Sequence, residues 1–225
     1  MIQWACERAQ SMGILDEVVV ATDAREIVSA CEDVGVAAVL TDPAHPSGTD
    51  RVAEVAERAE YRDAGIVVNL QGDEPLLDAG HVEAAVAEVR EGRDVGTCAT
   101  HLDSAEALVD PGTVKVVRRE DGTALYFSRA AIPHRRDGPM EGDFLARSGY
   151  LRHLGLYAYR RDALLAWVAL PPSRLEEIER LEQLRALEAG MTIGVAVVDH
   201  AETGVDTLDD ARRIEQRMRE LGFGS

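Results

Sequence analysis

The stretch from Ile66 to Pro75 constrains the fold of the chain more than any other. It opens with an Ile-Val-Val run, and successive β-branched residues are typical of a strand buried on both faces of a parallel sheet. The strand must stop near Gly72 and Pro75, because glycine permits unusual backbone angles and proline cannot continue a ladder. The stretch therefore predicts an α/β fold with this strand at the centre of the sheet.

Polar residues follow directly where this strand ends. Asp73 and Glu74 lie at the predicted carboxyl end of a central strand, the edge where ligands bind in open α/β sheets. An acid there can hold a divalent cation, and Gln71 can reach a substrate hydroxyl or a base edge. The same two acids are equally consistent with a turn that caps the next helix. The local pattern leaves both interpretations open.

The composition excludes several classes of protein. The chain has 225 residues, enough for one substantial core, with 46% hydrophobic and 29% charged residues, as in a soluble globular protein. Only 4% of the residues are aromatic, and the net charge is −17. Both values argue against a nucleic-acid-binding surface, which needs stacking side chains and positive charge. A nucleotide enzyme of this composition needs local cations or metal ions around the phosphates.

The cysteines and the hydropathy indicate the compartment. The three cysteines, Cys6, Cys31 and Cys98, are far apart in sequence and include no C-x-x-C pair. This pattern argues against a disulfide framework and against a zinc site. No apolar run approaches the length of a membrane span, and no signal peptide is visible. We expect a cytoplasmic protein without a membrane partner.

The first half of the chain alternates between predicted helices and strands. Such alternation predicts a Rossmann-like, doubly wound and mostly parallel sheet with right-handed crossovers. Helices are expected at 1–12, 24–34, 50–60 and 78–91, and strands at 17–21, 36–40, 66–70 and 95–100.

The second half has a different pattern. Val114, Val116 and Val117, followed by a turn at 121–122 and the run 124–127, predict a β-hairpin. A strand is expected at 150–159, helices at 161–168, 175–189 and 207–221, and a late strand at 192–198. No linker divides the chain. We therefore predict a single domain over 1–225 with a β-rich insertion at about 112–160.

Further polar clusters fall at predicted loops or strand ends. Ser47, Gly48 and Arg51 surround a helix start, where small residues and N–H groups can approach a base or phosphate, although Ser47 also suits an ordinary helix cap. His153 lies on an alternating strand, where a single histidine is more often structural than catalytic. Asp206 precedes the last helix and can cap it.

Taken in order, seven segments resemble one known family. They are SGTDR at 47–51, NLQGDEP at 69–75, VKVV at 114–117, ALYFSRAAIP at 124–133, RHLGLY at 152–157, LEQLR at 181–185 and TGVDT at 203–207. Together they resemble the 3-deoxy-manno-octulosonate (Kdo) cytidylyltransferases, the CMP-Kdo synthetases. The resemblance covers essentially the whole chain, and the second, fourth and fifth segments are specific to that family.

The resemblance implies a nucleotide-diphospho-sugar transferase fold and a nucleotidyltransferase activity that serves lipopolysaccharide synthesis. CTP and Kdo would give CMP-Kdo and pyrophosphate, through attack of the anomeric hydroxyl of the sugar on the α-phosphorus. Such a reaction needs orientation and charge neutralisation more than covalent help. The family places Mg²⁺ on Asp73 and Asp206, which would be the catalytic carboxylates, with the ion bridging the α-phosphate and the sugar oxygen.

The resemblance also assigns the binding residues. Ser47, Gly48 and Arg51 would face the cytosine and its ribose, with Gln71 close to the ribose or the sugar. Kdo is an acid sugar, so Arg129 and His153 are candidates for its carboxylate or hydroxyls. The remaining hydroxyls would be read by Tyr157, Glu182 and Gln183. The family match of Lys115 is clear, but it carries no assigned role.

One difference from the family pattern concerns the N-terminus. Family members begin with a strand and a basic loop resembling I-P-A-R-x-x-S-x-R-x-P-x-K, which grips the triphosphate, just before the helix that here starts at Met1. We therefore expect the polypeptide to be N-terminally incomplete. We also expect it to have little or no synthetase activity, and a version extended upstream to be active.

Two alternative functions remain. The chain could activate another acid sugar, such as a sialic acid or an amino-Kdo analogue, on the same sheet. It could also be a catalytically silent homologue that keeps only a dimer surface. The family implies a homodimer, and we expect its interface around residues 128 to 150.

Overall fold

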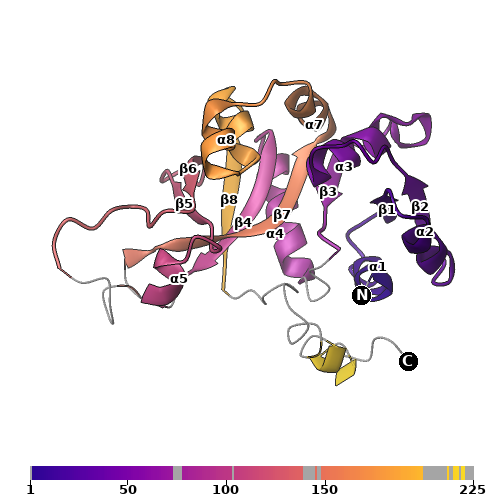
Figure 1. Cartoon of the computed structure of the whole chain (residues 1–225), viewed down its shortest axis with the longest axis horizontal. Coiled ribbons are helices and arrows are strands. Elements are labelled where there is room, and N and C mark those ends of the chain that lie inside the picture. The colour runs from indigo at the N-terminus through magenta and orange to yellow at the C-terminus, as the bar shows by residue number, and fades with distance from the viewer. Residues whose placement is uncertain are drawn as a thin grey trace. The chain divides into compact units, whose positions relative to one another are not determined.

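A computed structural model of the chain describes residues 2–72, 78–102, 104–138, 145, 148–199, 212, 215–217 and 219–220 (Figure 1). These residues fall into two compact units. Unit 1 contains residues 2–64, 69–72 and 78–80 together with the described residues after 211, and unit 2 contains residues 65–68 and 81–199. The prediction of a single domain over 1–225 with an insertion at 112–160 stays a prediction.

Unit 1 is built on a short parallel pair of strands. Its elements are α1 (Ile2–Ser11), β1 (Val19–Thr22), α2 (Arg25–Glu32), β2 (Ala37–Leu40), α3 (Gly48–Glu57) and the 3₁₀ turn η1 (Ala59–Tyr61). Strands β1 and β2 pair in parallel, with Val19 opposite Ala37. Cys6 of α1, Cys31 of α2 and Val36 are buried against one another, so the apolar faces of the two helices form the core of this unit.

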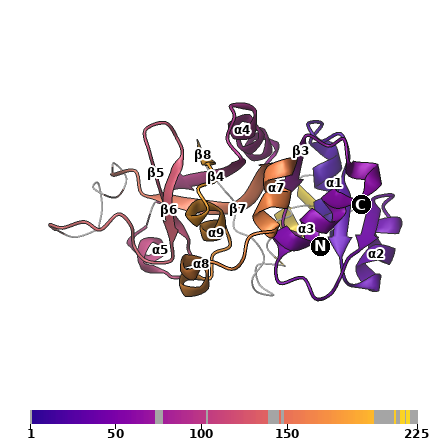
Figure 2. The same cartoon turned by 90° about the horizontal axis from the view of Figure 1, so that it is seen from above.

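Unit 2 is organised around a mixed sheet. Its elements are β3 (Ile66–Asn69, the last residue lying in unit 1), α4 (Ala79–Arg90), β4 (Val95–His101), α5 (Ala105–Val109), β5 (Lys115–Arg118), β6 (Ala124–Ser128), β7 (Leu151–Arg160), α7 (Arg161–Val168), α8 (Arg174–Glu179), α9 (Gln183–Glu188) and β8 (Ile193–Val198). The strand order is β6-β5-β7-β4-β8, and β3 pairs with β7. Figure 2 shows α4 on one face of this sheet and α8 and α9 on the other.

The predicted α/β class is confirmed, and the sheet is more mixed than the pattern suggested. The pairs β1–β2 and β4–β8 are parallel, as expected for crossover connections. The hairpin β5–β6 is antiparallel, as predicted. Strand β7 runs antiparallel to β4 and to β5, and it also pairs with β3.

Two glycines allow α4 to lie close to the sheet. Gly96 of β4 and Gly194 of β8 are register partners on neighbouring strands. A β-carbon at Gly96 would overlap the main-chain carbonyl oxygen of Ala85, and one at Gly194 would overlap the carboxylate of Glu88. Side chains are therefore excluded at this point, and α4 packs directly on the backbone of both strands.

The prediction of one helix over 175–189 is wrong. The segment forms α8 and α9, separated at Arg180, which adopts a left-handed conformation with φ of 54°. Ser173 begins α8 with a capping box to Glu176. The guanidinium of Arg129 donates to the carbonyl oxygens of Glu179 (2.9 Å) and Arg180 (3.3 Å). These bonds satisfy carbonyl groups that a continuous helix would otherwise use, and they stabilise the break.

The remaining predicted elements agree with the structure to within a few residues. Residues 212, 215–217 and 219–220 are helical, in line with the predicted helix at 207–221. Among the described residues, no helix is both long enough and apolar enough to cross a bilayer.

Candidate functional site

Ser47 and Gly48 form the start of α3 in unit 1. The Ser47 hydroxyl accepts a hydrogen bond from the main-chain N–H of Asp50 (3.3 Å) and donates to the Asp50 carboxylate (2.6 Å). Ser47 is therefore an N-cap, the structural alternative that its position allowed. A β-carbon at Gly48 would meet nothing within 4 Å, so the surface above the helix start is open. Both properties are compatible with a nucleotide approaching this helix terminus.

Arg51 joins the ends of the two strands of unit 1. Its guanidinium donates to the hydroxyl of Thr41 (2.5 Å), which follows β2, and to the carboxylate of Asp23 (3.1 Å), which follows β1. The main chain makes the same link, because Thr41 N–H donates to the Thr22 carbonyl (2.8 Å). Arg51 thus stabilises the carboxyl edge of the parallel pair, and its planar fork keeps donors in a fixed direction there.

The proposed metal ligands lie outside the described residues. This applies to Asp73 and Asp206, while Gln71 is described and is exposed in unit 1. Within the described residues, no group of three or more histidine, cysteine or acidic side chains could hold a metal ion. The placement of Mg²⁺ on Asp73 and Asp206 therefore stays a prediction.

An aromatic cluster surrounds His153 in unit 2. The His153 ring meets Phe127 edge-on, with centroids 5.0 Å apart, and lies 5.3 Å from the ring of Tyr157. Tyr157 in turn stacks on Tyr159 at 5.8 Å and meets Trp167 of α7 edge-on at 6.3 Å. Two residues predicted to bind the sugar thus lie side by side on one face of β7.

Burial keeps His153 and Tyr157 uncharged. Desolvation lowers the pKa of His153 to about 3, so its imidazole is neutral near pH 7. Burial first, and then the neighbouring Tyr159 and the negative charge of Glu182, raise the pKa of Tyr157 well above its usual value. A neutral imidazole and a neutral phenol are suited to hydroxyl recognition, and neither supplies a positive charge for a carboxylate.

Glu182 and Gln183 lie at the start of α9. Gln183 is 4% exposed, and Glu182 is half-buried and close enough to influence the pKa of Tyr157. The adjoining helix is fixed by Arg185, which makes two bonds to the carboxylate of Glu176 (2.9 and 2.6 Å). The structure therefore brings Glu182 near Tyr157, as expected of one binding surface.

Arg129 has a different environment from the one predicted for it. Besides the carbonyl groups of Glu179 and Arg180, its guanidinium donates to the carbonyl oxygen of Pro111 (2.9 Å). Its main-chain N–H donates to the Glu179 carboxylate (3.0 Å), which also accepts a bond from the Ser128 hydroxyl (2.6 Å). The side chain thus organises the break between α8 and α9, and contact with the sugar stays a prediction.

Lys115 is the only lysine of the chain, and it is fully buried. Its ammonium donates to the carbonyl oxygens of Asp110 (2.9 Å), Thr113 (2.5 Å) and Arg129 (2.6 Å). These three bonds use all three N–H donors of the group. Burial lowers the pKa of Lys115, and the charge of Asp110 partly opposes that effect. Lys115 therefore joins the turn at 110–113 to the end of β6.

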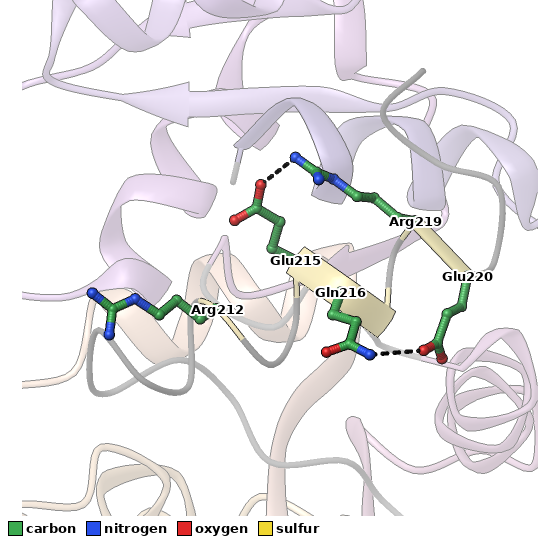
Figure 3. Close-up of a pocket in the computed structure, with 5 residues that line it drawn as sticks. All are labelled: Arg212, Glu215, Gln216, Arg219 and Glu220. Atoms are coloured by element: carbon green, nitrogen blue, oxygen red, sulfur yellow. Dashed lines mark hydrogen bonds and ion pairs between the residues drawn. The ribbon is translucent and has the colours of Figure 1, made fainter.

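A hollow at the C-terminal helix offers no alternative site. Its lining residues in the described part of the chain are Arg212, Glu215, Gln216, Arg219 and Glu220 (Figure 3). Arg219 pairs with Glu215 at 2.6 Å, and the Gln216 amide donates to Glu220 at 3.2 Å. None of the residues predicted for nucleotide or sugar is among these described lining residues.

The α/β fold and these polar clusters are those expected of a nucleotidyltransferase. The sequence profile of the family described as cytidylyltransferase matches residues 1–193. The chain belongs to this family, among the 3-deoxy-manno-octulosonate cytidylyltransferases, which confirms the resemblance noted in the sequence.

Similar proteins cover nearly the whole chain. The 3-deoxy-manno-octulosonate cytidylyltransferase of Acidobacterium capsulatum is 46% identical over 220 residues, which cover 98% of this chain and 86% of that protein. The one from Syntrophotalea carbinolica is 45% identical over 225 residues, covering 98% and 89%.

Solved structures agree with this assignment. A CMP:2-keto-3-deoxy-manno-octonic acid synthetase complexed with CTP matches with a TM-score of 0.87 and 38% identity, covering 98% of this chain and 88% of that one. A 4-diphosphocytidyl-2C-methyl-D-erythritol synthase from Anaerococcus prevotii matches with a TM-score of 0.63 at 10% identity, covering 97% and 88%, and shows the common fold alone.

Sequence reasoning missed two residues that bond to predicted site residues, Thr97 and Glu179. It had marked Lys115 as a family match without a role, and the structure shows that Lys115 bonds to the main chain of Arg129. Thr97 and Glu179 had no signal in the sequence, because their partners lie more than 45 residues away.

Proposed function

We propose that the chain transfers a cytidylyl group from CTP to Kdo, giving CMP-Kdo and pyrophosphate for lipopolysaccharide synthesis. The observation that carries this proposal is the 45–46% identity, over 98% of the chain, to proteins named for that reaction. The related synthetase solved with CTP supports the choice of nucleotide. A cytoplasmic location is part of the proposal and accords with three buried, unpaired cysteines.

The chemistry of the clusters supports the two substrates separately. In unit 1, the open surface above Gly48 and the oriented fork of Arg51 suit a base or ribose. In unit 2, the neutral His153 and Tyr157 beside Glu182 suit a polyhydroxylated sugar, which needs both donors and acceptors. We therefore assign nucleotide binding to Ser47, Gly48, Arg51 and Gln71, and hydroxyl binding to His153, Tyr157, Glu182 and Gln183.

The chain's contribution to catalysis is orientation. Displacement at an α-phosphorus requires the attacking hydroxyl and the leaving pyrophosphate to lie in line. We propose Mg²⁺ as the cofactor, held by Asp73 and Asp206, where it supplies charge neutralisation at the phosphate. The residues of the sugar cluster fix the hydroxyls, and the residues of unit 1 fix the nucleoside.

The proposal is tested by incubating the protein with CTP, Kdo and Mg²⁺ and measuring pyrophosphate release and CMP-Kdo by mass spectrometry. A chain extended upstream with the family's N-terminal strand and basic loop is assayed in parallel. We expect CMP-Kdo and pyrophosphate to form only when CTP, Kdo and Mg²⁺ are all present, and none after chelation of the metal. Failure of both lengths to form CMP-Kdo would contradict the proposal.

Competing substrates decide between the alternatives. A sialic acid or an amino-Kdo analogue that gives faster pyrophosphate release than Kdo would overturn the assignment of the sugar. Absence of Mg-CTP binding by both chains, together with self-association in solution, would favour a silent dimerising homologue. Light scattering tests the proposed homodimer, whose interface we place around residues 128 to 150.

A further inference from the structure

Thr97 of β4 lies at an irregularity in the sheet. Thr97 is opposite Tyr157 of β7, whereas the next residue, Cys98, is opposite Leu154, so β7 carries two extra residues at this point. Such a bulge turns carbonyl groups away from the ladder. The hydroxyl of Thr97 lies 2.7 Å from the carbonyl oxygen of Leu156 and 3.3 Å from that of Leu154. Thr97 is fully buried, so its hydroxyl is the group that satisfies the bulge.

The same hydroxyl contacts His153. Thr97 Oγ1 lies 2.9 Å from His153 Nε2. A hydroxyl has one proton to donate and two lone pairs, whereas a carbonyl oxygen can only accept. The proton of Thr97 therefore points to a carbonyl, and the contact with His153 must be completed by a proton on Nε2. If Nε2 were unprotonated, Thr97 would have to donate its proton to Nε2 instead of to a carbonyl. Its hydroxyl oxygen and the carbonyl oxygen of Leu156 would then face each other at 2.7 Å without a proton between them.

The other ring nitrogen is then an acceptor. With the imidazole neutral and Nε2 protonated, Nδ1 carries a lone pair. Within the part of the chain that the structure describes, Nδ1 of His153 has no hydrogen-bond partner, while the ring is held in place by Phe127 and Tyr157. A fixed lone pair of this kind attracts a hydroxyl donor and repels a carboxylate.

We propose that Thr97 is a positioning residue that holds His153 as the Nε2-protonated neutral imidazole, so that Nδ1 accepts a hydrogen bond from a sugar hydroxyl. The substrate part rests on the proposed function, because it takes Kdo as the sugar. It also resolves the choice left by the sequence, since a lone pair at Nδ1 assigns His153 to a hydroxyl and leaves the Kdo carboxylate to another group.

The tautomer is measured without any turnover. Long-range ¹H–¹⁵N spectra of histidine-labelled protein at pH 7 distinguish a protonated from an unprotonated ring nitrogen. We expect His153 to show a protonated Nε2 and an unprotonated Nδ1 in the wild-type protein and in Thr97→Ser, which keeps the hydroxyl. Thr97→Val, which has nearly the same shape, removes the acceptor, and we expect a mixture of tautomers. A wild-type spectrum with a protonated Nδ1 overturns the proposal.

Kinetics test the substrate part. In the assay described above, using the chain length that turns over, we expect Thr97→Val to raise KM for Kdo about tenfold, the effect of one hydrogen bond. KM for CTP should stay unchanged, and Thr97→Ser should restore KM for Kdo. An unchanged KM for Kdo in a folded Thr97→Val protein overturns this part. If neither chain length forms CMP-Kdo, the proposed function is wrong, and the assignment of Nδ1 to a Kdo hydroxyl is wrong as well. The wild-type spectrum still decides the tautomer of His153.

Discussion

The ammonium of the buried Lys115 donates a 2.6 Å hydrogen bond to the main-chain carbonyl of Arg129. Arg129 then donates through its guanidinium to Pro111 and to the two carbonyls at the end of α8. A single buried cation thereby connects β5, the turn at 110–113 and the end of β6 with the helix break that precedes Glu182 and Gln183. The segment before Glu182 and Gln183 is therefore held in place through Arg129 and the buried Lys115.

Replacement of Lys115 tests this connection. Lys115→Met keeps the length of the side chain and leaves three carbonyl groups without their donor, in a position closed to water. An unsatisfied buried polar group costs about 1–3 kcal/mol. The costs of the three carbonyls do not simply add, because all three had the same donor, so we expect a loss of about 3 kcal/mol in the free energy of unfolding. Urea denaturation followed by circular dichroism measures it. The control Arg119→Met removes an exposed cation, and we expect a change within about 0.5 kcal/mol. Equal midpoints for the two variants would contradict the structural role.

The single lysine also gives a direct probe of local opening. An amine-reactive acylating reagent can label only the terminal amine and Lys115 in this chain. Burial lowers the pKa of Lys115, which favours the reactive neutral amine, but the side chain is 0% exposed. We expect acylation of Lys115 to require opening of the turn at 110–113, and to be at least about a hundredfold slower in the native protein than in urea. Mass spectrometry of the Lys115 peptide against time gives both rates, and similar rates would show that the site is open.

Local patterns predicted most elements of the fold. The alternation of Val114, Val116 and Val117 and the turn at 121–122 gave a hairpin, because its pairing is between neighbours in sequence. The antiparallel position of β7 between β4 and β5 depends on contacts between distant segments, which periodicity does not contain. The same limit explains the wrong helix at 175–189, since the apolar period continues past Arg180. Its break is stabilised by Arg129, some 50 residues earlier.

The candidate site shows a similar division. Residue types and motif order identified His153, Tyr157 and Glu182, and the structure brings these three together in unit 2. Their protonation states could not be predicted, because they depend on burial and on the bulge opposite Thr97. For Arg129, the sequence indicated a cation available to a sugar, whereas its bonds to three carbonyls depend on where α8 ends.

The close packing of α4 on the sheet predicts different costs at two glycines. An added methyl group at Gly96 would overlap the main-chain carbonyl of Ala85, which cannot move without shifting the helix. At Gly194 the Glu88 carboxylate and the Arg93 side chain can shift, but the β-carbon of Glu88, at 2.8 Å, moves only with the backbone of α4. We expect Gly96→Ala to cost about 3 kcal/mol or more of unfolding free energy, and Gly194→Ala less, about 2 kcal/mol. Urea denaturation compares them with Gly65→Ala, where a β-carbon meets nothing within 4 Å. The reverse order of the two costs would contradict the packing.

The desolvated, half-buried imidazole of His153 predicts a dependence of stability on pH. The folded protein holds this group with a pKa of about 3, whereas an unfolded chain has the ordinary value of 6.5. Between these values the unfolded state binds a proton that the folded state does not. Stability from this group is therefore present above pH 6.5 and is lost as the pH falls toward 3, by up to about 1.4 kcal/mol per pH unit.

Protonation of carboxylates also lowers the free energy of unfolding as the pH falls. A variant is therefore needed to separate the contribution of His153. His153→Gln keeps a donor for Thr97 and cannot titrate in this range. We expect the unfolding free energy to fall less steeply with decreasing pH in His153→Gln than in the wild type between about pH 4 and 6. The slopes should differ by up to about 1.4 kcal/mol per pH unit, which corresponds to one proton. His101→Gln, on an exposed side chain at the end of β4, is the matched control for replacing a histidine in the same sheet. A wild-type slope identical to that of His153→Gln would mean that the imidazole takes up its proton equally in both states, and that the folded protein does not desolvate the ring.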